Sequence, residues 1–231
     1  MGNARSFKRS TGAHRGGVSA SVDEGRDSAL VGSAGRPGVF WFGNAPWAGT
    51  GYGTQAAQVV PRIAQEGFNI ACHVNYGFEA GNTTYNLNGH QIPIYGSGFG
   101  QWREDSINAN AQHYQQVIAA ERLLIITLCD VWTFRKDAIR DFPVWSWTPV
   151  DHAPIPPKVA AWFEHENVTA LSMSQFGSKM MDGAGIENHY VPHAFESVFV
   201  PTPTIKGADG SDKTGRQLLG IPDDAFLVMM N

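Results

Sequence analysis

A glycine-rich segment behind the first apolar run is the first place where this sequence could do chemistry. Residues 48–55 read AGTGYGTQ, in which Gly49, Gly51 and Gly53 surround Tyr52. Glycine lets a backbone approach a ligand closely, and the free N–H groups at the start of a helix attract phosphate. We therefore expect Gly49, Gly51, Tyr52 and Gly53 to bind the phosphates of a nucleotide. A tight turn without a ligand is the alternative, because the spacing is not G-x-G-x-x-G.

The end of the second apolar run argues against a nicotinamide cofactor. A dinucleotide-binding fold carries Asp or Glu about 20 residues beyond its glycines to bind the ribose. Asn75 stands there instead. The sequence also lacks a P-loop lysine, a G-x-S-x-G elbow and the His/Cys spacings of zinc sites. An oxidoreductase is therefore a weaker reading, an NTPase or hydrolase is set aside, and we predict neither a metal nor a bound cofactor.

Asp151 and His152 are the candidate catalytic residues. They follow the apolar run at 144–148, inside the proline-rich stretch TPVDHAPIPP. A carboxylate beside an imidazole can position a substrate hydroxyl or take its proton. The alternative is that Asp151 caps the helix that follows and that His152 only orders the loop.

Three more residues are candidates for substrate contact because each follows an apolar run. Asp130 and Trp132 come directly after residues 123–129, and His193 comes after residues 189–191. In open α/β sheets, ligands bind in the crevice at the carboxyl ends of the strands. We therefore expect Asp130, Trp132 and His193 to face a substrate, with a purely structural histidine as the alternative for His193.

The elements that must position these residues alternate along the chain. Apolar runs predict strands at residues 39–42, 68–74, 84–87, 91–95, 123–129, 144–148, 168–173 and 189–191. Helical spacing predicts helices at residues 54–66, 108–122, 133–140, 157–166 and 174–183, the last opened by Ser174 as N-cap. Asn88-Gly89 between two of the strands indicates a hairpin. Because most strands are continuously apolar, we predict an α/β fold with a doubly wound, Rossmann-like parallel sheet covered on both faces.

The composition predicts four segments along the chain. Residues 1–37 are rich in Gly, Ser and Arg and carry one aromatic residue, so we expect a disordered tail. Residues 38–200 hold the Rossmann-like domain. Residues 201–215 form a Pro/Gly/charged linker. Residues 216–231 predict a short helix and a strand, which we interpret as the beginning of a truncated second domain.

Composition and charge exclude several classes of protein. The chain has 231 residues, of which 42% are hydrophobic and 16% charged. Its longest strongly apolar run, at 123–129, is far shorter than the roughly 20 residues of a membrane span. Residues 1–38 hold six Lys/Arg against three Asp/Glu, and the rest hold 11 against 18, so nucleic-acid binding is not indicated. Cys72 and Cys129 lie in apolar runs typical of buried, reduced thiols, which predicts a cytoplasmic location.

Five parts of the sequence together resemble the amino-terminal domain of GT-B glycosyltransferases of the retaining family 4. The resemblance covers about residues 38–231. It rests on GTGYGTQ, DVW, TPVDHAPIPP, the pair LSMSQFGSKMMDGAG and HYVPHAFESVFVP, and RQLLGIPDDAFLVMMN. The family usually has glycine where Ala194 follows His193 here.

The resemblance implies a function for the complete enzyme. Such enzymes are hexosyltransferase-like: they move a sugar from a nucleotide diphosphate sugar to an acceptor hydroxyl, with retention and without an obligatory metal. The leaving phosphate helps to take the acceptor proton. The loop at Gly49 to Gly53 would lie beside the donor phosphates, and Asp130, Asp151 and His152 would line the acceptor side.

In that family the second domain holds most of the donor. A carboxy-terminal domain or a partner chain would have to supply it, and we expect negligible turnover from residues 1–231 alone. The alternative is a truncated or degenerate transferase half that acts as a binding or interaction module.

Overall fold

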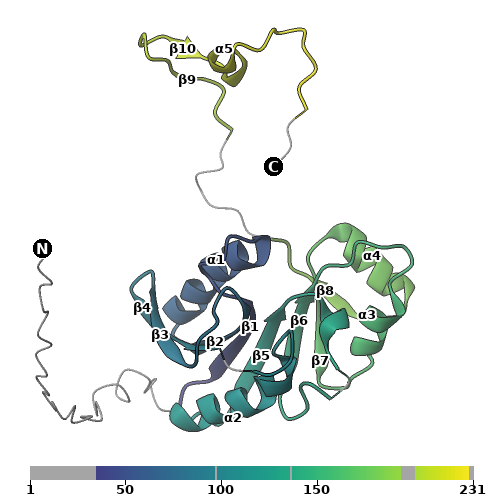
Figure 1. Ribbon diagram of the computed structural model, residues 1–231. Helices are drawn as coiled ribbons and strands as arrows, with labels where there is room; N and C mark the ends of the chain where they lie inside the picture. Colours follow the sequence, from purple (N-terminus) through teal and green to yellow (C-terminus); the bar gives the residue numbers. More distant parts are fainter. Residues whose placement is uncertain (1–34, 97, 136, 194–200, 229–231) are drawn as a thin grey trace, which may run out of the picture.

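An eight-stranded sheet forms the centre of the computed structural model, which describes residues 35–96, 98–135, 137–193 and 201–228 (Figure 1). Its strands are β1 (Gly38–Asn44), β2 (Asn69–Tyr76), β3 (Thr83–Leu87), β4 (His90–Tyr95), β5 (Leu123–Leu128), β6 (Val144–Thr148), β7 (Val168–Ser172) and β8 (Asn188–Tyr190). They lie in the order β3-β4-β2-β1-β5-β6-β7-β8. All neighbours run parallel except β3 and β4, which form the predicted antiparallel hairpin.

Helices cover both faces of this sheet. They are α1 (Gly51–Gln65), the short 3-10 turn η1 (Glu104–Ser106), α2 (Ile107–Val117), the 3-10 turn η2 (Val131–Thr133), α3 (Pro157–Trp162) and α4 (Gln175–Gly183). Alternate residues of β1 serve the two faces. Trp41 packs in one core with Val60 of α1, whereas Phe40 packs in the other with residues of α2, α3 and α4. The prediction of an α/β, Rossmann-like domain is therefore confirmed.

The order of the strands creates a crevice beside β1. The chain leaves β1 through α1 toward β2 on one side, and it returns through α2 to β5 on the other side. In a doubly wound sheet, the loops on the two sides separate at this switch point and leave a ligand-sized crevice at the carboxyl ends of the strands. The carboxyl ends of β1, β2 and β5 meet there.

Local signals explain several elements that the sequence predicted. Asn88 and Gly89 both have positive φ angles, 52° and 87°, as a tight two-residue hairpin loop requires. Ser174 caps α4 by accepting a hydrogen bond from the Gly177 N–H at 2.9 Å. Helix α2 ends at Val117, short of the predicted residue 122, and Ala119 then adopts a positive φ of 48°.

The helix predicted at residues 133–140 is wrong. The described part of this segment contains only the end of η2, followed by extended and turn residues. Phe134 turns its ring into the core, 5.4 Å from Phe42 and 4.7 Å from Trp162. Asn108 then fixes the chain, because its Oδ1 accepts the N–H group of Arg140 at 3.4 Å. Packing against the sheet and α2 therefore overrides the helical spacing.

The two ends of the chain carry further expectations. Residues 1–34 of the predicted disordered tail lie outside the described residues, whereas Arg36 donates to the Gly67 carbonyl at 3.1 Å. The predicted linker holds a small hairpin of β9 (Ile205–Lys206) and β10 (Asp212–Lys213), followed by α5 (Gly215–Leu219). The predicted strand beyond α5 does not form at residues 226–228, and residues 229–231 lie outside the described part.

Within the residues that the structure describes, no helix combines the length and the apolar character needed to cross a membrane.

Candidate functional site

A cavity of about 270 Å³ lies at the carboxyl ends of β1, β2 and β5, where the order of the strands predicts a ligand crevice. We call it the switch-point cavity. It is lined by Asn44, Thr50, Tyr52, Asn75, Tyr76, Trp102, Cys129, Asp130, Trp132 and Thr133. Three residues predicted from the sequence, Tyr52, Asp130 and Trp132, therefore come together in it.

The loop between β1 and α1 is held by a chain of side-chain hydrogen bonds. Asn44 Nδ2 donates to Thr50 Oγ1 at 2.7 Å, and Thr50 Oγ1 accepts the Gly53 N–H at 3.0 Å. Thr50 is thus the N-cap that starts α1. A side chain at Gly53 would come within 2.3 Å of the Ala48 carbonyl oxygen. Packing of the loop therefore explains this glycine without a ligand.

Gly49 and Gly51 have different surroundings from Gly53. A Cβ atom at either position would meet no atom within 4 Å, so a ligand has room to approach the backbone there. The first turn of α1 holds no acidic residue, which leaves the positive end of the helix dipole uncompensated. None of the three glycines lines the switch-point cavity, and their predicted contact with phosphate stays a prediction.

Tyr52 and Asp130 form the polar centre of the cavity. The Tyr52 hydroxyl donates to Asp130 Oδ2 at 3.2 Å, which joins the first turn of α1 to the end of β5. Burial raises the pKa of the Tyr52 hydroxyl well above its usual value, and the charge of Asp130 raises it further. Tyr52 therefore stays protonated as a donor. An ionised carboxylate accepts about four hydrogen bonds, so Asp130 keeps capacity for a substrate hydroxyl.

Two indole rings form the aromatic wall of the cavity. Trp102 and Trp132 meet edge to face, with ring centroids 6.2 Å apart. The segments that carry them are also joined by an ion pair between Glu104 and Arg135 at 3.4 Å. Trp132 is half exposed and also lines a neighbouring cavity of about 280 Å³ between η2 and α3. Sequence reasoning missed Trp102, because it lies in a loop that only the fold brings to the strand ends.

Arg103 anchors this loop next to Trp102. Its buried guanidinium donates to three backbone carbonyls, of Val74 at 3.2 Å, Phe78 at 2.5 Å and Gly96 at 2.6 Å. It also pairs with the exposed carboxylate of Glu79 at 2.8 Å. Arg103 has a positive φ of 55°, a conformation that costs a non-glycine residue energy and that these contacts maintain.

The buried imidazole of His73 contacts the backbone of Arg103. Its ring is fully buried, and Nε2 lies 3.1 Å from the Arg103 carbonyl oxygen while Nδ1 lies 3.0 Å from Asn110 Nδ2. The carbonyl needs a donor and the amide nitrogen needs an acceptor, so the neutral ring carries its proton on Nε2. Burial lowers the pKa of His73 to about 4. A buried polar network therefore fixes the loop that presents Trp102.

Asp151 and His152 lie outside the switch-point cavity. Asp151 Oδ1 is 2.5 Å from His152 Nδ1, and the two side chains are 80% and 70% exposed. The charge of Asp151 contributes to the raised pKa of Tyr52, so the Asp151 carboxylate lies at the same edge of the sheet as Tyr52. The alternative of Asp151 as a cap does not apply, because Pro156 is the N-cap residue of α3 and no side chain caps that end. Their catalytic role stays a prediction.

His193 lies farther along the sheet and makes packing contacts. Its Nε2 is 3.1 Å from Met173 Sδ, and its ring meets Trp147 edge to face at 5.2 Å. Partial burial lowers the pKa of His193. These contacts account for the residue without a ligand, although residues 194–200, which follow it, lie outside the described part of the chain.

The sequence signal at strand ends would have found more of the site. Asn44 ends β1, Tyr76 ends β2 and Thr133 closes the turn behind β5, all at carboxyl ends.

Cys129 and Cys72 are free and buried, and burial raises the pKa of both thiols. Among the described residues, no group of three or more His, Cys, Asp or Glu side chains is arranged to hold a metal ion.

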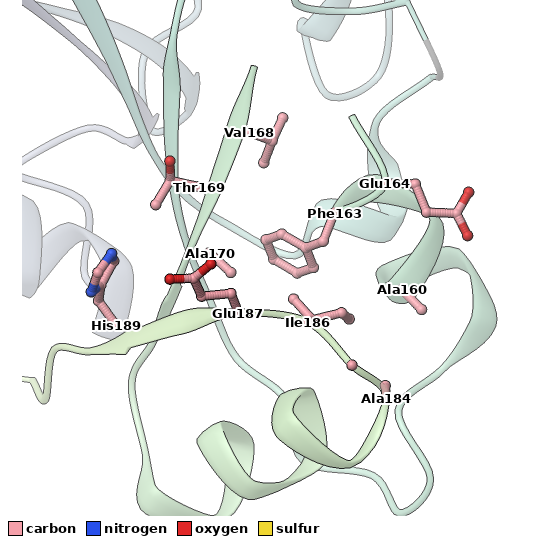
Figure 2. Close-up of a pocket in the computed structure, with 11 residues that line it drawn as sticks. Ala160, Phe163, Glu164, Val168, Thr169, Ala170, Ala184, Ile186, Glu187 and His189 are labelled. Carbon is pink, nitrogen blue, oxygen red and sulfur yellow. The ribbon is translucent and has the colours of Figure 1, made fainter. Parts of the chain in front are cut away.

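A larger cavity of about 540 Å³ lies elsewhere on the sheet. It is bounded by the end of α3, the first residues of β7 and the turn between α4 and β8. Figure 2 shows Phe163 and Ile186 between β7 and the chain that enters β8, with Glu164 pointing away from them. This cavity is at the amino-terminal ends of β7 and β8. No residue predicted for chemistry lines it, and ligands of such sheets bind at the opposite ends.

No protein-family model, curated protein or solved structure matches this chain. The fold and the geometry of the switch-point cavity are therefore the observations from which a function is inferred.

Proposed function

We propose that this chain is the acceptor-binding part of a retaining GT-B glycosyltransferase of the family 4 type. The complete enzyme moves a sugar from a nucleotide diphosphate sugar to an acceptor hydroxyl. The observation that carries this proposal is the switch-point cavity, in which Tyr52 and Asp130 form a polar centre beside Trp102 and Trp132. Aromatic walls with a few placed polar groups are typical of small-molecule sites.

The proposal assigns the two substrates to neighbouring places. The acceptor occupies the switch-point cavity, where the Asp130 carboxylate accepts a hydroxyl. The donor phosphates lie at the start of α1, where the backbone of Gly49 and Gly51 is open and the helix dipole favours an anion. Asp151 and His152 assist the acceptor from the end of β6. A second Rossmann-like domain, in the same polypeptide or a partner chain, supplies the remaining donor contacts.

One observation favours the alternative, a saccharide-binding module without transferase activity. Among the described residues that line the switch-point cavity, none is a lysine or arginine that could neutralise a diphosphate. A binding module needs no such residue. The decisive question is therefore whether the chain also binds a nucleotide sugar at the start of α1.

The test is saturation-transfer NMR of residues 1–231 with a panel of nucleotide diphosphate sugars and of saccharides. A transferase part should bind both classes in the millimolar range, with negligible turnover by itself. The variant Gly51→Asp places a negative charge in the first turn of α1, where the new side chain meets open space. Its control is Gly51→Asn.

Gly51→Asp should weaken nucleotide-sugar binding at least about fivefold relative to Gly51→Asn, because like charges about 4 Å apart cost about 1 kcal/mol even in water. Saccharide binding should stay unchanged in both variants. If saccharides bind but no nucleotide sugar does, or if Gly51→Asp binds nucleotide sugars like its control, the binding module is the better reading.

A further inference from the structure

We propose that the switch-point cavity selects a neutral, polyhydroxylated ring, such as an uncharged monosaccharide unit, and that Asn75 accepts a hydrogen bond from one of its hydroxyl groups. This inference rests on the proposed function for the role of the ring as acceptor. It adds the chemical class of the ligand and the residue that recognises it, neither of which follows from the fold.

The first observation is an unpaired acceptor in the wall of the cavity. Asn75 lines the cavity, and its Oδ1 atom is buried without a hydrogen-bond partner among the described residues. Buried polar atoms almost always have a partner, because an unsatisfied one loses its bonds to water and gains nothing in return. A carbonyl oxygen accepts and cannot donate, so the missing partner must be a donor such as a ligand hydroxyl.

The second observation is the charge of the lining. Asp130 is the single carboxylate among the described lining residues, and no lysine or arginine accompanies it. Arg103 donates to three backbone carbonyls and pairs with a carboxylate, and Arg135 pairs with Glu104. Lys158 lines the neighbouring cavity instead. An anionic ligand would be desolvated against a carboxylate without compensation.

The third observation is the aromatic surface. Trp102, Trp132 and Tyr76 line the cavity and are each at least about a third exposed. Large aromatic rings with a polar edge offer a rigid apolar face beside hydrogen-bonding groups. A sugar or cyclitol ring has the matching character, with C–H groups on its faces and hydroxyl groups around its edge.

The experiment compares matched pairs of probes on the full 231-residue chain. The pairs are glucose with glucuronate, galactose with galacturonate, mannose with mannose 6-phosphate, and inositol with inositol 1-phosphate. Binding is followed by tryptophan fluorescence and by saturation-transfer NMR. At least one neutral member should saturate in the millimolar range, and its anionic counterpart should bind at least about tenfold more weakly.

Variants then locate the binding. Asn75→Leu should weaken binding of the neutral ring about fivefold or more, the scale of one lost hydrogen bond in a buried setting. Its melting temperature should not fall, since the change removes a buried unpaired atom. Trp132→Ala should abolish most of the binding. Trp145→Ala is the matched control, because Trp145 is 46% exposed, Trp132 is 50% exposed, and Trp145 does not line the cavity.

The outcomes separate this inference from the proposed function. If an anionic member binds more tightly than its neutral counterpart, or if Asn75→Leu binds the neutral ring like the parent, the inference is overturned. If nucleotide sugars bind but none of the neutral rings does, the inference fails and the transferase proposal stands. If neither class binds, both fail.

Discussion

Acid should destabilise this fold through His73, whose ring has no exposed surface. The imidazole stacks on Phe42 with centroids 5.4 Å apart, and its two nitrogens meet the Arg103 carbonyl and the Asn110 amide. Burial disfavours the imidazolium form and lowers the pKa of His73 to about 4, from an ordinary value of 6.5. Protonation would also place a second donor against the Asn110 amide.

The sign and the magnitude follow from these two pKa values. Between pH 6.5 and 4 the unfolded chain binds a proton at His73 and the folded chain does not, so the free energy of unfolding falls as the pH falls. The contribution is fully present above pH 6.5. One pKa unit corresponds to about 1.4 kcal/mol, so the shift predicts a loss of about 2–3 kcal/mol between pH 7.5 and 4.5.

Urea unfolding at several pH values between 7.5 and 4.5 tests this prediction. The parent chain is compared with His73→Gln, which keeps a polar side chain but does not titrate. The variant is expected to be less stable at pH 7.5, and the difference in stability should shrink by about 2–3 kcal/mol at pH 4.5. Parallel stability curves for the two proteins would show that His73 becomes charged inside the fold at its ordinary pKa, which would refute the described burial.

Four further predictions concern the residues that hold the site in place and its outer loop. Arg103→Met should cost about 3–5 kcal/mol in urea unfolding, because buried carbonyls lose their donor. Glu79→Gln should cost less than about 1 kcal/mol, since Glu79 is exposed. Thr50→Ala should cost about 1 kcal/mol through loss of the cap on α1, measured in the same way. In an active enzyme that contains this chain, Asp151→Asn and His152→Ala should each lower kcat/KM about 100-fold, with less than about 1 kcal/mol change in stability; normal kinetics with a large drop in melting temperature would contradict their role.

Local patterns were enough for most of the strands and for the class of the fold. The strand at 144–148 has the predicted bounds, and the Asn-Gly hairpin and the Ser174 cap form as expected. Each of these depends on residues within a few positions of one another. The run at 144–148 contains no charged residue, and all of its residues except Trp145 are buried in β6; the absence of charge is visible in the sequence alone.

Long-range contacts explain what local patterns could not predict. Phe134 leaves the helical path because its ring fills space between Phe42 and Trp162, residues from two other elements. Trp102 reaches the cavity because Arg103 ties its loop to carbonyls of β2 and of the segments around β3 and β4. Neither arrangement leaves a signal in the neighbouring residues, since the partners are 25 or more positions away for four of these five contacts and only Gly96 is close in sequence.

The spacing of the strands decides which predicted residues can act on one small ring. Neighbouring strands lie about 4.8 Å apart, so the end of β6 is about 5 Å from that of β5 and the end of β8 is about 14 Å from it. Asp130 follows β5, directly beside β1, and it reaches Tyr52. Asp151 and His152 follow β6, the strand directly beside β5, so they are near enough to share a substrate with Asp130. His193 follows β8, where a ring bound at Asp130 is out of its reach. Functional residues lie at strand ends, but only the order of the strands shows which of those ends are close together. This order favours Asp130 over His193 as the residue that holds the acceptor hydroxyl.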